Sequence, residues 1–155
     1  MNNKIVLECE EGMERPAWAD RLASFAELVL EGTDKRNWDL SILLCRDPFI
    51  ADLNREYRKI DGPTDVLSFE QGDEYVDDAG DTWFSAGDIV ISVDSLMSNA
   101  REFGVTPDEE LKRLVIHGIL HLSGMDHSTN SPDEEMLVLQ ESLLLSFSGT
   151  EVYEQ

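Results

Sequence analysis

One eleven-residue segment, residues 117–127 (HGILHLSGMDH), contains all three histidines of this 155-residue chain. His117 and His121 are four residues apart, so on an α-helix their side chains leave the same face, one turn apart. Gly124 can adopt the left-handed conformation that ends many helices, which allows the chain to turn back. His127 can then approach the same point from outside the helix. The segment therefore predicts a helix, a glycine turn and three converging imidazoles.

Three converging imidazoles without a fourth protein ligand are typical of a catalytic zinc site, in which water completes the tetrahedron. The alternative, hydrogen-bonded histidines of a hydrophobic core, does not explain why all three occur in one window. We expect one zinc ion per chain, bound by His117, His121 and His127. In HExxH metallopeptidases a glutamate follows the first histidine and acts as general base. Here that position is Gly118, which disfavours a zincin-like peptidase.

The length and composition of the chain fit a single domain over residues 1–155, with 41% hydrophobic residues and no dividing linker or repeat. The N-terminal MNNKIVLECEEG lacks the hydrophobic run of a signal peptide. No stretch approaches the roughly 20 apolar residues that a membrane span requires. We therefore expect a cytoplasmic protein without a membrane partner. The oligomeric state is left open.

The net charge of −21 and the pI near 4.2 are opposite to those of most polyanion-binding proteins. Acidic residues are spread along the whole chain, so the simplest interpretation is a strongly solvated surface. Cys9 and Cys45 lie in apolar runs and lack a CxxC partner. We expect both to be buried, reduced thiols that bind no metal.

Hydrophobic periodicity predicts a single α+β domain: a four-stranded mixed sheet packed with helices, with the histidine helix central, as in zincin-like folds. The expected strands cover residues 4–9, 38–44, 66–69 and 89–93. The expected helices run from Pro16 to Gly32, from an N-cap at Asp47 to about Arg58, from about 94 to 104, from a Thr106 capping box through the histidines, and from a Ser131 capping box to Gly149. In the last helix we expect four residues to face inward, namely Met136, Leu139, Leu143 and Phe147. Residues 149–155 are expected to form a frayed tail.

Two charged segments stand out along the chain. Arg55, Arg58 and Lys59 are three of twelve basic residues and would share one face of a helix. From spacing alone, a cationic substrate site and an ordinary solvated helix end are equally good interpretations. Residues 70–81 contain six acidic residues and two glycines, which predicts a mobile surface hairpin or loop. The EF-hand spacing is missing, so calcium is not expected there.

The sequence resembles the YbeY family of bacterial metal-dependent endoribonucleases. The resemblance rests on HGILHLSGMDH together with three earlier motifs: Leu53-Asn54 through Tyr57-Arg58, DGPTDVLSF at residues 61–69, and Gly87-Asp88-Ile89. Two positions depart from the family pattern: Met125 stands where tyrosine is usual, and Glu70 stands where proline is common.

The resemblance implies a zinc-dependent endoribonuclease of ribosomal RNA maturation, acting at the 3′ end of 16S rRNA and in ribosome quality control. It assigns zinc to the three histidines, and the family's arginine maps onto Arg58, which would stabilise charge on the phosphate. Arg55 and Lys59 would assist substrate binding. The implied partners are ribosomal RNA, the small ribosomal subunit and a ribosomal protein. A ribosome assembly factor with a structural zinc is the alternative from another class. The general base stays open among Asp65, Asp88 and Asp126.

Overall fold

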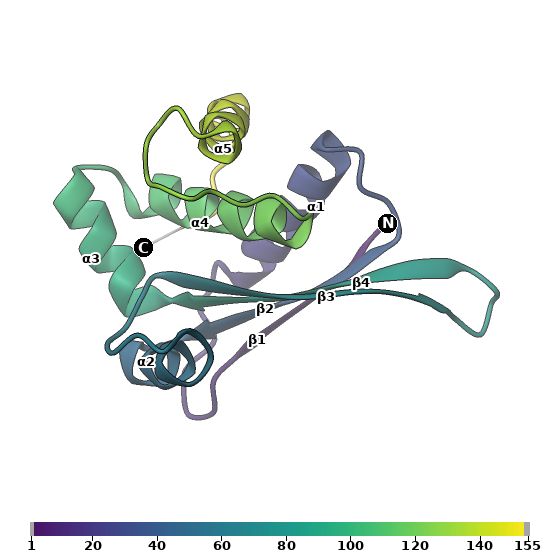
Figure 1. Cartoon of the computed structure of the whole chain (residues 1–155), viewed down its shortest axis with the longest axis horizontal. Helices are drawn as coiled ribbons and strands as arrows, with labels where there is room; N and C mark the ends of the chain where they lie inside the picture. Colours follow the sequence, from purple (N-terminus) through teal and green to yellow (C-terminus); the bar gives the residue numbers. More distant parts are fainter. Residues whose placement is uncertain (1, 154–155) are drawn as a thin grey trace.

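A four-stranded mixed sheet is the centre of the fold in the computed structural model, which describes residues 2–153 (Figure 1). Its strands are β1 (Lys4–Cys9), β2 (Trp38–Cys45), β3 (Val66–Val76) and β4 (Thr82–Ser92), in the order β1-β2-β4-β3. β1 and β4 both run parallel to β2, whereas β3 is antiparallel to β4. The predicted α+β class and the mixed sheet are confirmed.

The helices lie on both faces of the sheet. They are α1 (Ala19–Gly32), α2 (Asp47–Leu53), α3 (Val93–Phe103), α4 (Pro107–Leu122) and α5 (Glu135–Ser146), and a π-helical turn (Asn54–Arg58) extends α2. Figure 1 shows α1, α3, α4 and α5 on one side of the sheet and α2 on the other. The fold therefore has a thick helical layer over one face.

The histidine helix α4 is the central helix, as predicted. Ten of its sixteen residues are buried, and it contacts α1, α3, α5, β3 and β4. The Thr106 side chain caps its start by accepting a hydrogen bond from the Glu109 amide at 3.1 Å. Gly124 has φ = 98°, so the chain reverses after the helix as its sequence indicated.

The acidic segment 70–81 is a β-hairpin, the first of the two predicted alternatives. Residues 70–76 continue β3 and residues 77–81 form the turn into β4, and Figure 1 shows the hairpin extending beyond the body of the molecule. The Asp77 carboxylate accepts hydrogen bonds from Trp83 Nε1 at 2.8 Å and from the Asp81 amide at 2.9 Å. These bonds lower the pKa of Asp77, chiefly the one from Trp83. At least this acidic residue therefore has a structural role in the turn.

Two helix starts differ from the prediction. α1 begins at Ala19, because the Ala19 amide binds the Pro16 carbonyl and forms a turn before the helix. α5 begins at Glu135 with no side-chain cap, since the Ser131 hydroxyl accepts from the nearby Asp133 amide instead.

The first residue of α2 is Asp47, so its predicted role as the N-cap is wrong by one position. The Asp47 carboxylate instead accepts hydrogen bonds from the Ser92 and Ser95 hydroxyls, both at 2.6 Å. These bonds connect the start of α2 to the start of α3.

The buried face of α5 also differs from the prediction. Met136, Gln140 and Leu144 are buried, whereas Leu139 is 37% exposed. Spacing by four residues places the three buried side chains on one stripe that faces α4. The prediction is right for Met136, and Leu143 and Phe147 are half-buried against the core, but it is wrong for Leu139 and it missed Gln140 and Leu144.

The predicted frayed tail is wrong for residues 149–153. Val152 is fully buried, and its amide donates to Asp108 Oδ1 at 2.6 Å, as the Tyr153 amide does at 2.8 Å. The Lys112 ammonium also donates to the Thr150 carbonyl at 2.7 Å. The charged side chains of Asp108 and Lys112, near the start of α4, thus bind residues 150–153 to the body of the protein. Residues 154 and 155 lie outside the described residues.

The two cysteines are free thiols with different exposure. Cys45 is fully buried, as predicted, and burial raises its pKa to about 12. Cys9 is only half-buried, because β1 is an edge strand that leaves one side of its backbone uncovered. Within the described chain, no helix combines the length and hydrophobicity needed to cross a membrane.

Candidate metal centre

The three histidines converge as the sequence predicted. Their potential ligand atoms all lie within 4.8 Å of one another, and in the described part of the chain no other histidine, cysteine or carboxylate belongs to the cluster. His117 and His121 project from α4, and His127 reaches the same point from the loop after Gly124. The Nε2 atoms of His117 and His121 are 3.1 Å apart. The cluster can hold a metal ion on three nitrogen ligands.

A hydrogen bond to oxygen orients each imidazole. His117 Nδ1 lies 2.6 Å from Gln140 Oε1, His121 Nδ1 lies 3.1 Å from the Met125 carbonyl, and His127 Nδ1 lies 2.8 Å from the Thr129 carbonyl. These oxygens can only accept, so each Nδ1 carries the hydrogen and each Nε2 keeps a lone pair. Metal-binding histidines are commonly oriented in this way by partners beyond the metal.

The arrangement of lone pairs fits a divalent cation. Two unprotonated Nε2 atoms 3.1 Å apart cannot hydrogen-bond to each other, so they repel unless a cation lies between them. Zinc ligands at the usual zinc to nitrogen distance and tetrahedral angle are about 3.3 Å apart. The spacing of His117 and His121 is therefore close to that of a zinc site.

The surroundings keep two of the imidazoles neutral at pH 7. Burial lowers the pKa of His117. It also lowers the pKa of His121, and the neighbouring imidazoles of His117 and His127 lower it further. Only neutral imidazole has a lone pair for a metal, so the site is ready for metal at physiological pH.

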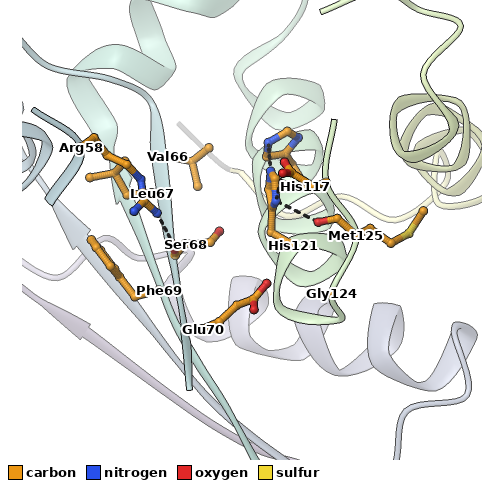
Figure 2. A pocket seen from close by; sticks show the side chains of 11 residues that line it. Arg58, Val66, Leu67, Ser68, Phe69, Glu70, His117, His121, Gly124 and Met125 are labelled. Carbon is orange, nitrogen blue, oxygen red and sulfur yellow. Dashed lines mark hydrogen bonds and ion pairs between the residues drawn. The ribbon is translucent and has the colours of Figure 1, made fainter. Parts of the chain in front are cut away.

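A pocket of about 720 Å³ opens beside His117 and His121. Figure 2 shows these histidines on one wall and residues of β3 on the opposite wall. The full lining is Arg58, Val66, Leu67, Ser68, Phe69, Glu70, His117, His121, Gly124, Met125 and Asp126. The lining combines apolar side chains with charged and polar ones, so the pocket offers polar contacts beside the histidines.

Arg58 lies on the strand side of this pocket (Figure 2). Its Nη2 donates to the Ser68 carbonyl at 2.8 Å, and its guanidinium lies 5.4 Å from the centre of the Phe69 ring. Arg58 ends the π-helical turn, and π-helical turns occur often at functional sites. Its remaining donors are available to an anion in the pocket.

The two other basic residues of the predicted patch do not line the pocket. Arg55 forms an ion pair with Asp52 at 2.8 Å, and the Lys59 ammonium binds the Glu56 carbonyl at 2.9 Å. The prediction assumed α-helical spacing, but the chain here is π-helical and then left-handed at Lys59. Of the three cations, the structure brings only Arg58 to the histidines.

The three candidate general bases occupy different places. Asp126 lines the pocket. Asp65 lies outside its lining and accepts hydrogen bonds from Asn99 and from the Val66 amide. Asp88 binds Ser41 in a different pocket, on the α2 side of the sheet, because successive residues of a strand face opposite sides. The suggestion of Asp88 as the base is therefore wrong.

Sequence reasoning missed Gln140 and Glu70. Gln140 binds His117 and is buried in α5, and Glu70 adds a carboxylate to the pocket. A polar residue spaced four from Met136 and from Leu144 in an apolar helix was the available signal for Gln140. The carbonyl partners of His121 and His127 had no signal in the sequence, since any residue supplies a carbonyl.

Comparisons with known proteins identify the family of the chain. The family model described as Endoribonuclease YbeY matches residues 8–148. The chain belongs to the YbeY family. A curated relative named Endoribonuclease YbeY from Treponema denticola is 56% identical, covering 99% of each chain. Another of that name, from Aquifex aeolicus, is 38% identical and covers 93% of this chain and 91% of the relative. The resemblance inferred from the motifs is confirmed.

A solved structure shares the fold of this chain. The solution structure of a protein from Thermotoga maritima aligns with a TM-score of 0.64 at 29% identity. The alignment covers 94% of this chain and 89% of that one. The overall fold described above is therefore shared with an experimentally determined structure.

Proposed function

We propose that this YbeY chain is a zinc-dependent endoribonuclease that hydrolyses phosphodiester bonds of ribosomal RNA. The observation that carries the proposal is the cluster of three histidines, two of which, His117 and His121, line a pocket that also contains Arg58. The relatives named Endoribonuclease YbeY support the reaction class. The proposal includes two more specific roles for the protein, namely processing of the 3′ end of 16S rRNA and participation in ribosome quality control.

The residues present would hold zinc through Nε2 of His117, His121 and His127. A bound zinc ion would lower the pKa of water and polarise a phosphoryl oxygen. Gln140 and the carbonyls of Met125 and Thr129 keep the imidazoles in the ligand tautomer. The protein thus supplies a rigid, preorganised donor set.

Arg58 would stabilise the negative charge that grows on the phosphate. The Ser68 carbonyl holds one of its nitrogens, and the Phe69 ring lies beside the guanidinium, so its direction is restricted. A guanidinium can bind two phosphoryl oxygens at once, whereas an ammonium offers a point charge. Arg58 would therefore act on the phosphate and the histidines on the metal. Arg55 and Lys59 would contribute at most a general attraction for RNA.

The general-base glutamate of HExxH peptidases has no counterpart at its usual position in this chain. Gly118, at the position of the HExxH glutamate, is buried between α4 and the sheet. A side chain at this position would enter the core and could not reach the pocket. A structural zinc in an assembly factor would need a closed fourth ligand, and none of residues 2–153 adds one to the cluster.

The strong negative charge bears on how the protein finds its substrate. A chain with net charge −21 repels free RNA over long distances. We therefore propose that the substrate is presented in the small ribosomal subunit in the cytoplasm, where a ribosomal protein supplies part of the binding. Cleavage of rRNA in precursor particles should then exceed cleavage of the same RNA alone, and the difference should shrink in high salt.

The test is metal analysis joined to cleavage of a structured rRNA fragment. Native protein should contain one zinc per chain and cleave the RNA internally, and the His117→Ala variant should lose both properties. Native protein that binds zinc tightly but leaves both free and ribosomal RNA uncut would contradict the enzymatic proposal and favour the assembly factor. Arg101→Ala, a change on α3 in a different pocket, should keep both properties and is the control for a substitution away from the site.

A further inference from the structure

Behind His117 the structure contains a chain of polar contacts that leads away from the metal site. Gln140 is 6% exposed, and its Oε1 lies 2.6 Å from His117 Nδ1. Its Nε2 donates to Glu141 Oε2 at 3.0 Å. Both ends of the buried amide are therefore occupied, one by the imidazole and the other by a carboxylate.

Glu141 is in turn held by Arg113 of α4. Arg113 Nε donates to Glu141 Oε2 at 3.0 Å, and Nη2 donates to Oε1 at 3.1 Å, a two-point grip on the carboxylate. The hydrogen bond from Arg113 also lowers the pKa of Glu141. The carboxylate is thus ionised at neutral pH and can only accept hydrogen bonds.

This contact determines which way the Gln140 amide faces. A flipped amide would place Gln140 Oε1 against Glu141 Oε2, so two acceptors would repel at hydrogen-bond distance. It would also place an NH₂ group against His117 Nδ1. The imidazole would then carry its hydrogen on Nε2, the atom that faces His121, and would lose the lone pair needed there.

We propose that Glu141 is a positioning residue for the metal site: by orienting the Gln140 amide, it holds His117 in the tautomer that presents Nε2 to a metal. The inference builds on the metal site of the proposed function, but it concerns hydrogen-bond direction, which can be measured without metal. Glu141 touches neither the metal ligands nor the pocket, and its side chain is 51% exposed. Its removal should therefore disturb the fold little.

The first experiment observes the tautomer directly. Long-range ¹H–¹⁵N correlation spectra of metal-free protein at pH 8 distinguish protonated from unprotonated imidazole nitrogens. Native protein should show His117 with hydrogen on Nδ1, and Glu141→Ala should show a substantial fraction with hydrogen on Nε2. A His117 signal unchanged between the two proteins would overturn the proposal.

The second experiment measures zinc affinity by competition with a chromophoric chelator. Loss of an outer partner of a metal-binding histidine commonly costs about 10- to 100-fold in metal affinity, and we expect that range for Gln140→Met. Glu141 acts through Gln140, so Glu141→Ala should cost less, about 3- to 10-fold. Cobalt can replace zinc as a spectroscopic reporter of the coordination.

The matched control is Glu109→Ala. Glu109 also forms an ion pair with Arg113, at 3.2 Å, and is similarly exposed, but it has no contact with Gln140. Its removal takes away the same charge from the same arginine. Glu109→Ala should leave zinc affinity and the His117 tautomer close to native, and an equal loss in both variants would mean that charge alone is responsible.

A double-mutant cycle separates orientation from electrostatics. Gln140→Glu presents an acceptor oxygen to His117 whichever way its carboxylate turns, so it needs no orienting partner. In that background, adding Glu141→Ala should not lower zinc affinity. A similar loss with and without Gln140→Glu would overturn the proposal. If native protein itself binds no zinc, the proposed function fails, whereas the tautomer experiment still decides the role of Glu141.

Discussion

Gly118 on α4 lies directly against Ile89 on β4. A Cβ built on Gly118 would be 2.8 Å from Ile89 Cδ1 and 2.9 Å from Cγ2, closer than real side-chain contacts allow. The absence of a side chain lets the helix lie close to the sheet beside the histidines. The same close approach explains why the glutamate of HExxH peptidases cannot stand at this position.

Gly118→Ala should therefore destabilise the protein. Overpacking a core typically costs about 1–3 kcal/mol, and the better helix propensity of alanine offsets about 1 kcal/mol of that cost. Urea denaturation of the zinc-free protein measures the change in the free energy of unfolding. Gly149→Ala is the control, because a Cβ at that position would meet nothing within 4 Å. Equal stability of the two variants would contradict the packing argument.

Zinc binding should need all three histidines and should depend on pH. Each of His117→Ala, His121→Ala and His127→Ala should abolish tight binding of one equivalent, measured by metal analysis after dialysis. Since burial lowers the pKa of His117 and His121 below the ordinary 6.5, protons should compete with zinc only below about pH 6. If any one of these variants kept full zinc affinity, the histidine replaced in it would not be a zinc ligand.

The metal-free protein should lose stability as the pH falls below about 6.5. In the unfolded chain His117 and His121 take up protons near their ordinary pKa of 6.5, whereas in the folded chain burial lowers both pKa values. The unfolded state then binds more protons, so the free energy of unfolding decreases from pH 6.5 down to the folded pKa values. Thermal unfolding followed from pH 7.5 to 5 checks this. His117→Ala should weaken the dependence.

Arg58→Ala should lower the turnover rate by roughly 100-fold or more with normal zinc content, if its guanidinium meets charge that develops in the transition state. Arg58→Lys should restore little, because an ammonium cannot form the two-point contact. Single-turnover cleavage of an rRNA fragment measures the effect. A rise in KM alone, removed by salt, would show that Arg58 merely attracts the RNA.

Glu70→Gln should tighten RNA binding. Its carboxylate lines the pocket on the strand side, where it repels an incoming phosphate (Figure 2). Removing the negative charge of Glu70 from the pocket should lower KM by about 2- to 5-fold without changing kcat. Steady-state kinetics at low salt checks both constants. A tenfold or larger fall in kcat would instead identify Glu70 as a proton acceptor in the reaction.

The thiol of Cys45 should be chemically inert in the folded protein. With a pKa raised to about 12, only about one thiol in ten thousand is ionised at pH 8. Iodoacetamide should therefore modify half-buried Cys9 before Cys45, as mass spectrometry of the peptides would show. Cys45→Ala should leave zinc content unchanged, and a loss of zinc would give the thiol a role at the site.

The sequence alone determined the features that depend on neighbours within one element. The spacing of His117 and His121, the Thr106 cap and the Gly124 reversal all follow from helix geometry and local backbone preferences. These features act over four or five residues, so the chain has few ways to realise them. They were sufficient to predict the three converging imidazoles and the central helix.

The tertiary structure decided what meets across distant segments. It placed Arg58 at the pocket and Asp88 on the far face of the sheet, and it brought Gln140 to His117 from 23 residues away. Such contacts depend on strand order, on which face a side chain takes, and on how helices pack. A change of one residue in register reverses the face, and local periodicity does not encode the partner. The candidate metal ligands could thus be predicted from the sequence, whereas the groups that orient these ligands could be identified only from the tertiary structure.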